Sequence, residues 1–170
     1  MRYRATALSL DSESQVVAAA WGYELALSQE PRDVGLRLDL AALYAVVNDT
    51  GFSAAHHLDA RFVDAAYPRA RELLEQGLAL YPGHPEFHAL MYHLDERVLG
   101  RPIQPERLET LASDPRAEFA RLLLYVESGR EAHRSSAEAT FRDAAPGRTA
   151  RQRYYMSFAP ASLRGGRQAG

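Results

Sequence analysis

Five of the six histidines lie within residues 56–93, and this cluster is the first place in the sequence to look for chemistry. Its members and the nearby carboxylates are His56, His57, His84, His88, His93, Asp59, Asp95 and Glu96. Neutral imidazole and carboxylate groups together suit zinc or another transition metal. One interpretation of the chain is therefore a metal-dependent enzyme or metal-binding protein that uses this cluster.

The spacing of these histidines argues against a metal site. On a helix, His88 and His93 point about 140° apart. His84 directly precedes a proline, which places it at a helix start, and the neighbours His56 and His57 cannot both face one ion from a regular helix. The chain has no cysteine, and it lacks Gly-x-Ser-x-Gly, glycine-rich phosphate-loop and His-Glu-x-x-His motifs. We therefore expect no bound metal, no cofactor and no catalytic residue.

The second stretch with chemical potential is the C-terminal tail, residues 147–170. It contains five arginines and no acid, so the remaining residues carry a formal charge of −7 within a total of −2. The tail places Arg151 and Arg153 beside Tyr154, Tyr155 and Phe158. Arginine with aromatics can bind single-stranded nucleic acid, and it is equally typical of a segment that docks on protein. Because the tail is basic and the body is acidic, the tail is expected to dock on something acidic, such as another copy of the body. Terminal segments are, however, often simply unattached.

Composition places the chain among ordinary globular proteins. With 170 residues, 46% apolar and 25% charged, it suits one soluble domain with a working core. The N-terminal apolar run is too short for a signal peptide, and no stretch approaches a membrane span, so we expect a cytoplasmic protein. All 20 basic residues are arginine, which indicates a GC-rich, bacterial genome.

Apolar residues recur at helical spacing along most of the chain and predict an all-α fold. Residues 1–10 lack a clear period and are expected to form an arm. Ser12 and Gln15 have the spacing of a capping box, which predicts that the first helix begins there. The expected helices are 12–29, 34–47, 67–82, 85–98, 105–113, 115–129 and a last one that ends near 144 and carries Ala137, Phe141 and Ala144.

Small, aromatic and proline residues also recur in a pattern. The first set is Ala19, Tyr23, Ala26, Leu27 and Pro31, the second is Leu40, Ala41 and Tyr44, and the third is Ala70, Leu74, Gly77, Leu78 and Pro82. This pattern resembles the tetratricopeptide repeat, which has a small residue, an aromatic, a small–leucine pair and a closing proline in units of about 34 residues. Pro82 to Pro115 fits that length, whereas Pro31 to Pro82 is longer, which predicts an insert at about 48–66.

The resemblance implies a short solenoid of about three helical hairpins over residues 11–146, with the insert at about 48–66 and a basic tail at 147–170. In this family the first helix of each pair lines a concave groove that binds a partner peptide or helix. The corresponding positions here are Leu38, Ala42, Ala45, His88, Tyr92, Asp95 or Glu96, Arg121 and Tyr125. The chaperone-type members grip a carboxylate with lysines and asparagines, but lysine is absent and Ala42 stands where asparagine is expected, so we do not expect that kind of binding.

The resemblance therefore implies a non-catalytic adaptor or chaperone-like module. Its partner is expected to be a protein or peptide, such as another copy of the chain, with no membrane and with nucleic acid as an alternative through the tail. The arginine–aromatic set Arg151, Arg153, Tyr154, Tyr155 and Phe158 is expected to dock. The opposing interpretation of the groove residues is that they pack against the arm or tail of the same chain.

Overall fold

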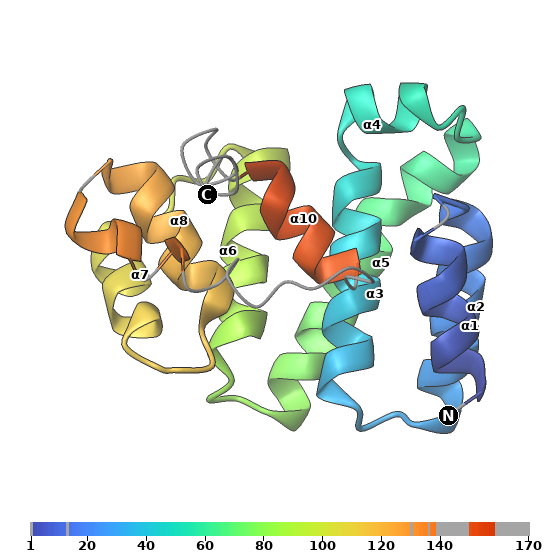
Figure 1. The fold of residues 1–170 in the computed structure, drawn as a ribbon, viewed down its shortest axis with the longest axis horizontal. Helices are drawn as coiled ribbons and strands as arrows, with labels where there is room; N and C mark the ends of the chain where they lie inside the picture. Colours follow the sequence, from blue (N-terminus) through green and yellow to red (C-terminus); the bar gives the residue numbers. More distant parts are fainter. Residues whose placement is uncertain (1, 13, 130, 136, 139–149, 159–170) are drawn as a thin grey trace, which may run out of the picture. The chain divides into compact units, whose positions relative to one another are not determined.

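The computed structural model describes residues 2–12, 14–129, 131–135, 137–138 and 150–158, and within them it contains helices and no strand (Figure 1). The elements are α1 (Arg2–Ser12), α2 (Val16–Gln29), α3 (Val34–Val47), α4 (Thr50–Ala55), α5 (Ala60–Leu80), α6 (Pro85–Leu99), α7 (Pro105–Ala112), α8 (Glu118–Ser128), η1 (Glu131–His133) and α10 (Ala150–Phe158). The expected all-α class of helical hairpins is confirmed. None of the described helices is both long enough and apolar enough to cross a membrane.

The chain divides into two compact units. The N-terminal unit comprises residues 1–82 and 146–154, and the C-terminal unit comprises residues 83–145 and 155–170. The first division, after residue 82, lies inside the range 11–146 that the sequence predicts as one repeat domain. The second division falls within α10, between Tyr154 and Tyr155.

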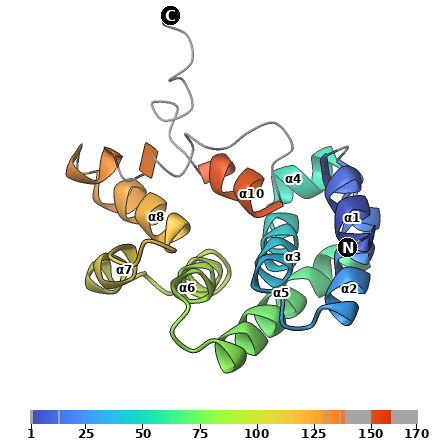
Figure 2. The same cartoon turned by 60° about the horizontal axis from the view of Figure 1, so that its bottom comes forward.

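Helix α1 is an integral part of the N-terminal unit, where it packs along α2 (Figures 1 and 2). A Cβ at Gly22 would lie 3.0 Å from the Ala7 Cβ, so glycine is what lets these two helices approach so closely. Arg4 also pairs with Asp33, at 2.9 Å, just before α3. Residues 1–10, expected to form an arm, are therefore mostly a packed helix.

The chain between α1 and α2 differs from the expected capping box. Ser12 ends α1, and its hydroxyl donates to the Ser9 carbonyl at 2.7 Å. Helix α2 begins at Val16, and Gln15 before it makes no side-chain cap. The expected single helix over 12–29 thus begins later, because the serine serves the preceding helix.

Helix α3 has the predicted bounds and is enclosed within the N-terminal unit. Its N-cap, Asp33, accepts a hydrogen bond from the Leu36 amide at 2.8 Å, which satisfies one of the free amides of the first turn. Helices α2, α4 and α5 all pack against α3. Most of its side chains are consequently buried, including polar ones.

Helix α5 begins at Ala60, well before the expected start at Tyr67, and it continues through Pro68. Asp59 caps it by accepting from the Arg61 amide at 2.9 Å. Its buried positions lie on both sides of the proline, at Ala66, Ala70, Leu73, Leu74 and Gly77. Packing of this continuous face against α3 therefore outweighs the local cost of an interior proline. Helix α4 occupies part of the expected insert.

In the C-terminal unit, α7 packs on α8, and α6 contacts both (Figure 2). The buried apolar side chains of these helices include Phe87, Leu90, Leu94, Leu108, Phe119, Leu122 and Leu123. Helices α6 and α8 end at Gly100 and Gly129, which have φ of 65° and 60° and form left-handed C-caps. Both stops agree with the sequence prediction. Most of the last expected helix, including Phe141 and Ala144, lies outside the described residues.

Trp21 does not belong to the core, although it is an apolar residue within the expected helix over 12–29. It is 72% exposed, and Val17 and Leu25 on the same side of α2 are also exposed. The buried side is instead formed by Ala19, Ala20, Tyr23, Ala26 and Leu27. Helix α2 is apolar nearly all round, so periodicity alone cannot choose its inner face, and the small residues that allow close packing do.

Candidate functional site

The main candidate site is a pocket between α6 and α7 in the C-terminal unit, with a volume of about 260 Å³. We call it the α6–α7 pocket. It is lined by Tyr92, Asp95, Arg101, Pro102, Ile103, Gln104 and Arg107. Tyr92 and Asp95 are two of the residues predicted to bind a partner. Helix α6 presents them together because they are three residues apart and so lie on one side of it.

The α6–α7 pocket combines an aromatic ring with opposite charges. The Arg107 guanidinium lies over the Tyr92 ring, 5.6 Å from its centroid, in a cation–π contact. Arg101 lies 3.5 Å from the Asp95 carboxylate, and 67% of the Arg101 side chain is exposed. Two guanidinium groups and one carboxylate leave this pocket with an excess of positive charge. It can accept an apolar side chain and an acidic group together.

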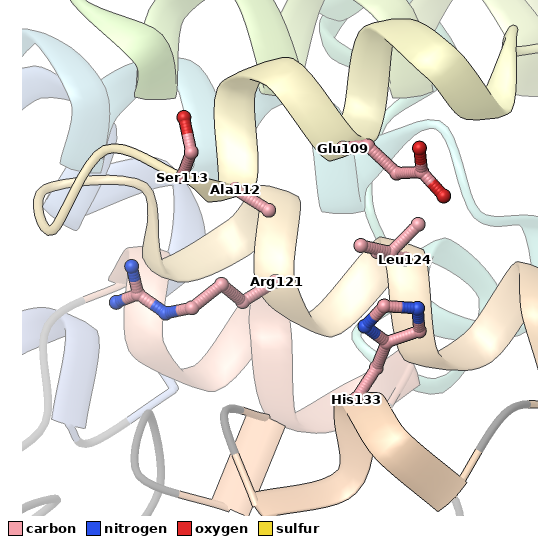
Figure 3. Close-up of a pocket in the computed structure, with 6 residues that line it drawn as sticks. All are labelled: Glu109, Ala112, Ser113, Arg121, Leu124 and His133. Atoms are coloured by element: carbon pink, nitrogen blue, oxygen red, sulfur yellow. The ribbon is translucent and has the colours of Figure 1, made fainter.

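Arg121 lines a different pocket of the same unit, between α7, α8 and η1 (Figure 3). This second pocket has a volume of about 210 Å³ and is lined by Glu109, Ala112, Ser113, Arg121, Leu124 and His133. Figure 3 shows Leu124 between Glu109 and His133, with Arg121 extending away from them. The Arg121 guanidinium donates to the Asp114 carbonyl at 3.0 Å, so it holds the loop before α8.

The remaining predicted groove residues divide between the two units. In the C-terminal unit, His88 and Tyr125 are partly exposed, and the His88 ring lies 6.1 Å from that of Tyr92. In the N-terminal unit, Leu38 and Ala42 are fully buried, and Ala45 is buried too. The prediction that Leu38 and Ala42 meet a partner in an open groove is therefore wrong, because α3 is enclosed by its neighbouring helices.

The tail arginines pair with buried carboxylates of the N-terminal unit. Arg153 forms an ion pair with Asp11 of α1, and the Arg151 Nε lies 3.6 Å from Asp39 of α3. The Tyr23 hydroxyl also donates to Asp11, at 3.1 Å. Burial raises the pKa of the Asp11 carboxyl above its usual range, and the Arg153 charge opposes that rise. These contacts fit the expectation that the tail docks on acidic groups.

Tyr155 docks within the C-terminal unit. Its hydroxyl donates to the buried Glu86 carboxylate, and its ring stacks on Phe119 at a centroid distance of 4.3 Å with nearly parallel planes. Glu86 also accepts the Phe119 amide hydrogen, at 2.8 Å. One buried carboxylate thus serves two donors. Tyr154 is buried in the N-terminal unit, and the Phe158 side chain lies outside the described part of the chain.

The histidine cluster does not come together. Within the described residues, no three or more histidine, aspartate or glutamate side chains are placed to hold a metal ion. His93 is buried, with its ring edge-on to Phe119 at 5.2 Å. Burial, aided by the charge of Arg97, lowers the pKa of His93 to about 3. Its imidazole is therefore neutral at physiological pH.

Sequence reasoning missed several charged residues of these sites. Arg101 and Arg107 of the α6–α7 pocket lie in a loop and on a short helix, where no period marks a binding face. Asp39 could have been identified from the sequence, because an acid within the leucine-rich segment 36–43 is expected to be buried and to need a partner. Arg69 on α5 forms a bidentate pair with Glu24 on α2, at 2.7 and 2.6 Å. Nothing in the sequence connects positions so far apart.

Comparisons with protein-family models, with curated proteins and with solved structures gave no match.

Proposed function

We propose that this protein is a non-catalytic interaction module, of the tetratricopeptide-like adaptor or chaperone-like class, that binds a peptide segment of a protein partner in the α6–α7 pocket. The observation that carries the proposal is the grouping of Tyr92, Asp95, Arg101 and Arg107 around one opening of about 260 Å³. Helical hairpins are a common scaffold for peptide recognition.

The chemistry of the α6–α7 pocket suggests the kind of peptide. Tyr92, Pro102 and Ile103 offer apolar surface for one side chain of the ligand. Arg101 is exposed and Arg107 lies at the edge of the same opening, so both can meet a carboxylate of the ligand. Asp95 opposes a second acidic group. We infer a segment with an apolar or aromatic residue next to a single acid.

The alternatives have less support. The hypothesis of a metal-dependent enzyme requires several ligands around one point, and among the described residues no three histidine, aspartate or glutamate side chains are placed to hold a metal ion. Nucleic-acid binding through the tail requires arginines that can reach phosphates, but Arg151 and Arg153 already lie against Asp39 and Asp11. Peptide binding in the α6–α7 pocket requires no rearrangement of the histidines or of the tail arginines.

A peptide library displayed on phage tests the proposal directly. The full-length protein should enrich peptides with the inferred pattern. Tyr92→Ala and Arg107→Ala should each lower the affinity for a chosen synthetic peptide at least tenfold, as measured by fluorescence anisotropy. Arg116→Ala is the matched control, because Arg116 is an exposed arginine of the same unit that pairs with Asp114. Circular dichroism checks that each variant keeps its helices.

The outcome that would overturn the proposal is equally definite. If no sequence pattern is enriched, or if Tyr92→Ala and Arg107→Ala bind the selected peptide as tightly as Arg116→Ala does, the α6–α7 pocket is not a peptide site.

A further inference from the structure

We propose that Asp11 and Asp39 form a binding site in the N-terminal unit for an arginine-bearing helix. In the structure the first turns of α10 occupy this site. A basic helical peptide of the same pattern binds there by displacing α10. This site is separate from the α6–α7 pocket and does not depend on the function proposed for it.

The carboxylates of this site are buried on two different helices. Asp11 at the end of α1 is 6% exposed, and Asp39 within α3 is 1% exposed. An ionised carboxylate loses its hydration on burial and requires a cation or several donors in return. The Tyr23 hydroxyl supplies a neutral donor to Asp11 but no charge. The two acids therefore create a demand for cations.

The cations come from outside the helical hairpins of the unit. Arg151 and Arg153 belong to α10, and they meet Asp39 and Asp11 respectively. Two residues apart on a helix, they leave its axis about 200° from each other. Tyr154, next to them, is 4% exposed. The unit thus contacts α10 through both arginines and Tyr154, and the recognised pattern is arginine, any residue, arginine, tyrosine.

Helix α10 depends on its contacts for its own order. It has nine residues, and isolated helices shorter than about 12–15 residues are marginal in water. The free energy of exchanging α10 for a similar peptide therefore depends mainly on the docking contacts. Formal charge favours the encounter, because the tail carries five arginines and no acid, whereas the rest of the chain has a formal charge of −7.

The test uses the full-length chain and a fluorescein-labelled synthetic peptide of residues 150–158. The double variant Arg151→Ala/Arg153→Ala weakens the resident ligand, so it should bind the peptide at least tenfold more tightly than the parent does in fluorescence anisotropy. Adding Asp39→Asn to this variant should weaken binding at least tenfold. Asp64→Asn, an exposed acid on α5, is the matched control and should leave binding unchanged.

A second arm changes the peptide alone, so it does not depend on the folding of a protein variant. Replacing both arginines of the peptide by glutamine should abolish binding to the same protein preparation. Raising the NaCl concentration from 50 to 500 mM should weaken binding of the unmodified peptide, since the attraction is partly electrostatic. A concentration-dependent dimer that the peptide dissociates would support the same site with a second copy's α10 as occupant.

The proposal is overturned if the double variant binds the peptide no more tightly than the parent, or if the glutamine peptide binds as well as the arginine peptide. Tyr92→Ala separates the two sites, because it should leave this peptide's affinity unchanged. A loss of affinity in that variant would assign the peptide to the α6–α7 pocket and would also overturn the proposal.

Discussion

Glu86 is a buried acid whose two oxygens each accept from a different donor, the Phe119 amide and the Tyr155 hydroxyl. Truncation to alanine leaves both donors buried without this acceptor, and each such loss costs about 1–3 kcal/mol. We therefore predict that Glu86→Ala lowers the free energy of unfolding by about 2–4 kcal/mol in urea titrations. Tyr155→Phe removes one donor but keeps the ring on Phe119, so its effect should be smaller.

The control for this prediction is Glu75→Ala. Glu75 is exposed and pairs with Arg71 one helical turn away, a contact of about 0.3–0.5 kcal/mol at most. If Glu86→Ala costs no more than Glu75→Ala, then Glu86 does not join Phe119 and Tyr155 in the folded protein.

His93 makes stability depend on pH in a defined direction. An unfolded histidine has a pKa of about 6.5, whereas in the folded protein burial holds the pKa of His93 at about 3. At a pH between these two pKa values, His93 is protonated in the unfolded chain and neutral in the folded chain. This contribution to stability is therefore fully present above pH 6.5 and is lost as the pH falls towards 3, by up to about 1.4 kcal/mol per pH unit.

The measurement is the free energy of unfolding of the parent and of His93→Gln between pH 7.5 and 4. The other ionisable groups are common to both proteins, so the difference between the two curves isolates His93. We expect the difference to be constant above pH 6.5 and to move in favour of the variant below it. Parallel curves would mean that His93 is accessible to protons.

At the scale of the element, the sequence predicts best where its local signals are strong. Asp33 before α3, and Gly100 and Gly129 after α6 and α8, are caps whose chemistry is local, and these boundaries agree with the prediction. Helix α1 was missed because its polar composition hides its contact with α2. The exposure of Trp21 could not be predicted, because α2 is apolar nearly all round and only tertiary packing decides which side is buried.

Helix α5 shows how packing overrides a local signal. Pro68 predicts a helix start, yet α5 begins at Ala60 and buries Ala66 before the proline. An interior proline lacks an amide hydrogen and crowds the preceding turn, at a cost of about 3 kcal/mol. Since Pro68 is exposed, replacing it should remove this cost without leaving a cavity. We predict that Pro68→Ala raises the free energy of unfolding by about 1–3 kcal/mol.

Pro105→Ala provides the contrast. Pro105 stands in the first turn of α7, where proline has no helical hydrogen bond to lose. It should therefore leave stability unchanged or lower it slightly in the same urea titration. Equal effects of the two substitutions would show that Pro68 begins a helix, as the sequence alone suggests.

The candidate site was only partly predictable for a related reason. Tyr92 and Asp95 share one face of α6, and helical spacing finds such pairs. Arg101 joins them from the loop after Gly100, whose path depends on how α7 packs on α8. Leu38 and Ala42 were expected to be open because the resemblance supplies positions for a groove but not the helices that close over it.

At the scale of the whole molecule, the chain is organised as two compact units, whereas a continuous stack of repeats was expected. In a repeat stack, each hairpin is stabilised by its neighbours, and damage in one spreads to the next. Two units with separate cores should instead unfold as two cooperative steps. The buried leucines of the N-terminal unit and those of the C-terminal unit allow each step to be perturbed separately.

We predict that Leu122→Ala, in the core of the C-terminal unit, lowers that unit's free energy of unfolding by about 2–5 kcal/mol and leaves the other unit unchanged. Native-state hydrogen exchange resolves the two units, because backbone amides of α3 report the N-terminal unit and those of α8 report the C-terminal unit. Leu122→Ala should speed amide exchange in α8 but not in α3, and Leu74→Ala should speed exchange in α3 but not in α8. If either variant moves both signals by the same amount, the units unfold together, and the continuous repeat stack becomes the better description.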